Sequence, residues 1–169
     1  DMLNTSLKVE RAATDWLRHT TSGVQRAAAI AKSSDPSLIE YFAPATAASI
    51  AQTNDLQKLI EAALDSPEEK ELFARIGELR KTYLAAREEV SKAKKAGDAE
   101  GAARLFAERF EPTSKSYLEG VTDLVTRQRE QLDASAARVE ALRTRTVWLL
   151  VGCTALALVV GIALSIVLT

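Results

Sequence analysis

Two stretches of this sequence carry side chains that could bind a small anion. Arg80, Tyr83 and Arg87 are spaced by three and four residues, which places both guanidinium groups on nearly the same side of a helix. An upstream stretch carries small hydroxyl side chains at the same spacing: Thr46, Ser49 and Thr53. Guanidinium groups bind carboxylates through paired hydrogen bonds, so the two sets together predict a pocket for a small organic anion.

These two sets face one another if their helices form a hairpin around a turn at residues 65–67. The residue numbers of each facing pair then add to nearly the same value, as an antiparallel hairpin requires. The hydroxyls interrupt the apolar stripe of their helix, where buried polar groups need partners. In the alternative interpretation, the arginines are surface residues of an ordinary bundle and each hydroxyl bonds back to its own helix.

Other chemistry is scarce in this chain. His19, next to Arg18, is the only histidine, and Cys153 is the only cysteine. The usual zinc, haem and di-iron sites need more of these ligands, so we expect no metal, no cofactor, no catalytic residue and no enzyme activity. The 22 basic and 23 acidic residues are interspersed, which gives no basic stripe for nucleic acid.

Apolar residues at helical spacing predict an all-α protein. Helices are expected at about residues 3–33, 36–64 and 67–96, followed by a fourth helix that starts after Asp98 and bends at Pro112. Asp35 before Pro36, and Ser66 with Pro67, have the composition of helix starts, while Gly97 is suited to a helix end. Short turns between long helices favour an up-down-up-down antiparallel four-helix bundle.

The last stretch, Thr146–Thr169, contains no charged residue. As a helix it would span about 36 Å, enough for the ~30 Å hydrocarbon core of a bilayer. Because neither Gly nor Pro occurs between Val121 and Val151, the fourth helix is expected to continue into this transmembrane helix. The predicted organisation is therefore a four-helix-bundle domain at residues 1–145 and a membrane segment at 146–169.

This architecture and one local motif resemble the sensory module of bacterial methyl-accepting chemotaxis proteins of the four-helix-bundle type. The segment Ala96–Thr113 resembles the opening of helix four in the enteric aspartate receptor class, where a Phe-Ala…Pro-Thr stretch precedes a long helix. The Thr of that motif contacts the ligand in the family and falls on Thr113. The resemblance implies a periplasmic bundle anchored in the bacterial inner membrane, a homodimer or higher homo-oligomer, and signalling by helix displacement.

The ligand class is expected to differ from the aspartate receptors. Their ligand-binding arginines follow a Trp on helix one, whereas after Trp16 this chain has Arg18 and Arg26 in another spacing. The pair Arg80 and Arg87 is more similar to the bundle receptors for citrate and malate. We therefore expect a di- or tricarboxylate ligand.

Small residues on the first helix suggest where two copies would meet. They form a narrow alanine-rich face that would allow close approach of a second chain: Ala12, Ala27, Ala28, Ala29 and Ala31. A second functional hypothesis fits the same pattern, namely a membrane-tethered helical adaptor or scaffold that binds other helices and no small molecule.

Overall fold

The computed structural model describes the backbone of residues 2–167 and the side chains of residues 4–138, 140, 144 and 148. The chain divides into two units, Asp1–Arg129 and Glu130–Thr169. The described residues form helices and turns and no strand, which confirms the all-α prediction. The elements in chain order are α1 (Met2–Lys32), α2 (Leu38–Glu61), α3 (Pro67–Lys95), α4 (Ala99–Leu105), the π-helix η1 (Phe106–Phe110) and α5 (Glu111–Val167).

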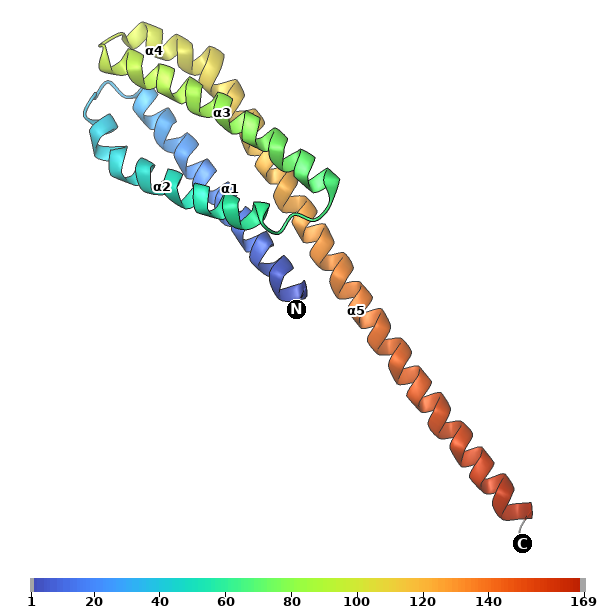
Figure 1. The fold of residues 1–169 in the computed structure, drawn as a ribbon. Coiled ribbons are helices and arrows are strands. Elements are labelled where there is room, and N and C mark those ends of the chain that lie inside the picture. Colours follow the sequence, from blue (N-terminus) through green and yellow to red (C-terminus); the bar gives the residue numbers. More distant parts are fainter. Residues whose placement is uncertain (1, 168–169) are drawn as a thin grey trace. The chain divides into compact units, whose positions relative to one another are not determined.

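The first unit is a bundle with four arms, as predicted. α1 and α2 lie side by side, and α3 lies along α4 and η1 (Figure 1). The fourth arm consists of α4, η1 and the part of α5 that belongs to this unit, up to residue 129. The second unit is the rest of α5.

Local sequence signals explain how α3 begins and ends. The Ser66 hydroxyl accepts a hydrogen bond from the Glu69 N–H (3.1 Å), and the Glu69 carboxylate accepts one from the Ser66 N–H (3.2 Å), with Pro67 as the first helical residue. This reciprocal capping satisfies two backbone donors. Gly97 adopts φ +76°, which glycine tolerates without strain, and Asp98 then caps α4 through the Gly101 N–H (2.7 Å). The sequence predicted all three helix boundaries: the start of α3 at Ser66 and Pro67, its end at Gly97, and the start of α4 after Asp98.

The start of α2 differs from the prediction. The helix begins at Leu38 and not at Pro36. Asp35 closes a turn ahead of the helix because its carboxylate accepts a hydrogen bond from the Ser37 N–H (2.9 Å). Hydrogen bonding with the Ser37 side chain, and then with the Ser37 backbone, lowers the pKa of Asp35. A Ser-Asp-Pro-Ser sequence therefore formed a turn where a helix start was expected.

The interruption of the fourth helix also lies elsewhere than predicted. It is the π-helical turn Phe106–Phe110, in which the Glu111 N–H bonds to the Phe106 carbonyl, five residues back. Pro112 follows as the second residue of α5 and has no N–H to offer the Glu108 carbonyl. The backbone adjusts upstream of the proline, and the wider turn keeps the rings of Phe106 and Phe110 buried and stacked at 5.3 Å.

The centre of the core is aromatic. Trp16 is fully buried, and its indole N–H donates a hydrogen bond to the Tyr117 hydroxyl (2.6 Å). The Tyr83 ring stacks on that of Tyr117 at 5.2 Å and lies 5.6 Å from that of Phe110. α1, α3, η1 and α5 thus meet through these rings.

The alanine-rich face of α1 is largely inside the bundle. Ala12, Ala27 and Ala31 are buried within their own chain, and Ala29 is exposed. The prediction that these residues form an outward seam for a second copy is wrong for the three buried positions, because small side chains also let helices of one chain approach closely.

No helix among the described residues has a stretch long and apolar enough to cross a membrane. Apart from residue 148, the side chains of the predicted membrane segment 146–169 lie outside the described residues. That segment stays a prediction from sequence.

Candidate functional site

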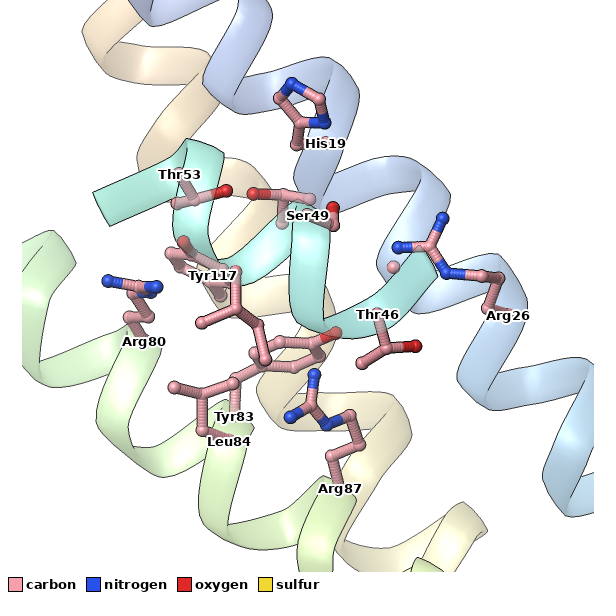
Figure 2. Close-up of a pocket in the computed structure, with 13 residues that line it drawn as sticks. His19, Arg26, Thr46, Ser49, Thr53, Arg80, Tyr83, Leu84, Arg87 and Tyr117 are labelled. Atoms are coloured by element: carbon pink, nitrogen blue, oxygen red, sulfur yellow. The ribbon is translucent and has the colours of Figure 1, made fainter. Parts of the chain in front are cut away.

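A small cavity lies where α1, α2, α3 and α5 meet, and it contains the residues singled out by their spacing. Six of the seven predicted site residues line it (Figure 2): Thr46, Ser49, Thr53, Arg80, Tyr83 and Arg87. The turn at residues 65–67 sets the register in which α2 presents its hydroxyls and α3 its arginines. The cavity measures about 30 Å³, room for little more than a water molecule.

The seventh predicted residue, Thr113, does not line this cavity. Its hydroxyl donates to the carbonyls of Arg109 (2.7 Å) and Phe110 (3.1 Å) in its own helix. The side chain that the receptor resemblance placed at the ligand is thus bonded back to the π-helical turn.

α1 and α5 add lining residues that the spacing argument did not assign to the site: Thr20, Gly23, Arg26 and Tyr117. His19, which was noted at a similar height, also lines the cavity (Figure 2). The sequence did contain a pattern that could have indicated the α1 residues, because residues 19, 23 and 26 are spaced by four and three and so lie on one side of a helix. What the sequence could not supply was how α1 is rotated against α2 and α3.

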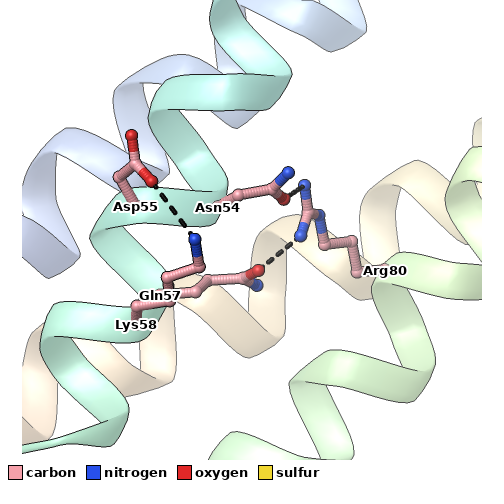
Figure 3. Close-up of polar contacts among 5 residues, drawn as sticks. All are labelled: Asn54, Asp55, Gln57, Lys58 and Arg80. Atoms are coloured by element: carbon pink, nitrogen blue, oxygen red, sulfur yellow. Dashed lines mark hydrogen bonds and ion pairs between the residues drawn. The ribbon is translucent and has the colours of Figure 1, made fainter.

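The arginines around the cavity have no acidic partner among the residues that the structure describes. Arg80 donates to the amide oxygens of Asn54 (2.7 Å) and Gln57, both on α2 (Figure 3). The nearby Asp55 carboxylate pairs instead with Lys58 at 3.6 Å. Within the described part of the chain, neither Arg80 nor Arg87 forms an ion pair.

Arg26 likewise forms no ion pair with an acidic side chain among the described residues. Its Nη1 donates to the Ser22 hydroxyl (2.8 Å), while its Nε is buried and has no hydrogen-bond partner among the described residues. A buried donor without a hydrogen-bond partner is costly.

The two tyrosines supply neutral donors. Burial raises the pKa of Tyr83, and the nearby Arg87 offsets this only in part. Burial also raises the pKa of Tyr117, against hydrogen bonds from Thr20 and Trp16. Both phenols therefore keep their protons at neutral pH, and the Tyr83 hydroxyl lies beside Gly23, where a Cβ would approach it to 3.4 Å.

The α2 hydroxyls do not behave like ordinary helix serines and threonines. Thr21, Thr82 and Thr122 bond back to a carbonyl four residues earlier. No such bond is formed by the hydroxyls of the α2 set in the described structure, although Thr53 is buried. The alternative in which each hydroxyl serves its own helix therefore fails for these positions, and they are available to a ligand.

Taken together, three guanidinium groups, two neutral phenols and four small hydroxyls line one cavity, a set of groups that can donate several hydrogen bonds to an anion. No group of three or more His, Cys, Asp or Glu side chains among the described residues could hold a metal ion. The fold and the site thus define a helical bundle with a cavity between its helices that is lined by arginine, tyrosine, serine and threonine side chains.

Comparison with known protein families identifies the family of the chain. It belongs to the family described as the four helix bundle sensory module for signal transduction, whose model matches residues 22–141. The match spans most of the bundle and includes every cavity residue from Gly23 onward. The resemblance to chemoreceptor sensory modules is confirmed at this level, and the family is a signalling family. A search of curated proteins found no match.

Proposed function

We propose that this chain is the ligand-binding sensory domain of a transmembrane chemotaxis receptor that recognises a small organic anion, a di- or tricarboxylate such as malate or citrate. The observation that carries the proposal is the set of three arginines around one cavity, Arg26, Arg80 and Arg87, which have no carboxylate partner in the described part of the chain. Two carboxylates are the ligand chemistry that best matches several guanidinium forks.

Binding requires the cavity to widen. A volume of about 30 Å³ is too small for a dicarboxylate, so α2 and α3 separate as the ligand enters. α2 is suited to this movement because it buries only Thr53 and Ile60. Arg80 then exchanges the amides of Asn54 and Gln57 for a carboxylate, which is a stronger, charge-assisted partner.

The family and the sequence also support a proposal for the rest of the receptor. The bundle lies in the periplasm, residues 146–169 anchor it in the bacterial inner membrane, and the receptor works as a homodimer or higher homo-oligomer. The ligand shifts the balance between two arrangements of the helices because it binds one of them more tightly.

Calorimetric titration of the full chain with malate, citrate and succinate tests the proposal. At least one acid should bind, and Arg87→Ala or Arg80→Ala should weaken it by roughly thirtyfold or more, as expected when one partner of a charge pair is removed. Arg75→Ala is the matched control, since Arg75 lies on the same helix but is exposed and pairs with Asp123 at 3.6 Å. Equal losses in all three variants would contradict the site, and no binding of any acid would favour the adaptor hypothesis.

A further inference from the structure

A second, larger cleft adjoins the cavity that is lined by Arg26, Arg80 and Arg87, which we call the anion cavity. It measures about 290 Å³ and is walled mainly by apolar side chains of α1, α2, α3 and η1: Ala27, Ile30, Ile39, Ala47, Val90 and Phe110. Four residues line both spaces, namely Gly23, Thr46, Ile50 and Arg87. Arg87 thus lies at the boundary between the polar anion cavity and the mainly apolar cleft.

We propose that one ligand occupies both spaces, with its carboxylates in the anion cavity and an apolar body, an aryl or branched alkyl group, in the cleft. The inference rests on the proposed function and narrows it to carboxylates that carry an apolar substituent. Citrate and malate have no group for the cleft, so they are poorer ligands than apolar-substituted acids with the same head group.

The dimensions of the two spaces support this division. The anion cavity has room for little more than water, whereas the cleft exceeds the ~150 Å³ that is enough to hold benzene in a protein interior. Gly23 has no side chain to separate the two spaces. The head group is therefore held closely by polar side chains, and most of the free volume is available to an apolar body.

The side chains of α2 explain why this volume is open. Ala43 and Ala47 face the cleft with single methyl groups and are exposed, while Ile39 and Ile50 are only half-buried. Apolar side chains left partly open to solvent gain free energy when an apolar group covers them. A ligand body would thus complete the packing of α2 against the bundle.

The charged residues that line the cleft indicate at which end the negative charge of the ligand lies. Glu88 lines the cleft and pairs only distantly with Lys92, at 3.9 Å. Lys95 also lines it and lies at the C-terminal end of α3. Of the described charged residues that line the cleft, Arg87, Glu88 and Lys95, only Arg87 also lines the anion cavity, so the negative charge of the ligand belongs at that end.

A matched ligand pair tests the inference. Succinate and phenylsuccinate carry the same two carboxylates, and only the latter has an aryl group. In calorimetric titrations of the full chain, phenylsuccinate should bind roughly ten- to a hundredfold more tightly, the gain expected for burying one aromatic ring. The same affinity for both acids would overturn the inference and leave the anion site intact.

A variant locates the aryl group. Ala47→Phe places a ring in the cleft without touching the anion cavity, so it should reduce the preference for phenylsuccinate to less than roughly threefold and leave succinate binding unchanged. Ala48→Phe is the matched control, because Ala48 is exposed on the same helix and lines neither space. A preference that persists in Ala47→Phe would overturn the assignment of the cleft. If neither acid binds the parent chain, the proposed function itself fails, and this inference with it.

Discussion

The two walls of the anion cavity are built differently. On one side, Tyr83 and Tyr117 are stacked and buried, and Trp16 holds the Tyr117 hydroxyl. On the other side, the hydroxyls of α2 belong to a helix that buries only Thr53 and Ile60. The aromatic wall is therefore part of the core, whereas the α2 wall packs against the core with few buried side chains. This indicates that α1, α3 and α5 provide most of the stability of the bundle, and that α2 is the helix whose position a bound ligand would fix.

The largest effect that tests this contrast is on stability. Trp16→Ala removes a fully buried ring and should lower the free energy of unfolding by about 3 to 5 kcal/mol. Tyr41→Ala, on α2, should change it by less than about 1 kcal/mol, because the Tyr41 side chain is 74% exposed and contacts mainly the Phe42 ring. Urea titration of both variants measures the difference, and similar losses would show that α2 carries as much of the stability as the core.

A smaller effect separates the two stacked tyrosines. Tyr117→Phe leaves the buried Trp16 N–H without an acceptor and should cost about 1 to 3 kcal/mol of stability. Tyr83→Phe removes a hydroxyl that points into the cavity, so its main effect should be weaker carboxylate binding. Unfolding and calorimetry on the same two proteins check this, and a stability loss confined to Tyr83→Phe would reverse the assignment.

The smallest expected effect concerns alkaline pH. Burial raises the pKa of Tyr83 and of Tyr117 above the ordinary value of 10.0. Above about pH 10 the unfolded chain therefore loses these protons before the folded chain does, so stability is full below pH 10 and falls as the pH rises further. The double variant Tyr83→Phe/Tyr117→Phe should show a shallower fall in urea titrations between pH 9 and 11, and an unchanged slope would contradict the link to these phenols.

The parts of the fold that were predictable depend on neighbours in sequence. Ser66 with Pro67, and Gly97 with Asp98, set helix ends through contacts within a few residues. The hairpin turn likewise fixes which residues of α2 and α3 face one another, so the register argument found six of the thirteen residues that line the cavity. The π-helical turn was missed because its cause, the missing N–H of Pro112, acts on the backbone upstream of the proline.

The parts that were not predictable depend on packing between distant helices. Arg26 and Tyr117 reach the cavity only because α1 and α5 are rotated toward it, and no local pattern sets that rotation. Ala27 and Ala31 have the same composition whether they pack inside one chain or between two. Thr113 was assigned from a family motif, and its hydroxyl is satisfied within its own helix.

Hydrogen exchange of the α2 amides is the most direct test of the central claim, that an anion held by Arg26, Arg80 and Arg87 secures α2 to the bundle. Because α2 buries little apolar surface, its amides should exchange faster than those of α1 and α3 in the free protein. A saturating carboxylate should slow exchange in α2 by roughly tenfold or more and change α1 and α3 far less, and Arg87→Ala should abolish that protection. Equal exchange in α2 with and without a bound carboxylate would contradict the account.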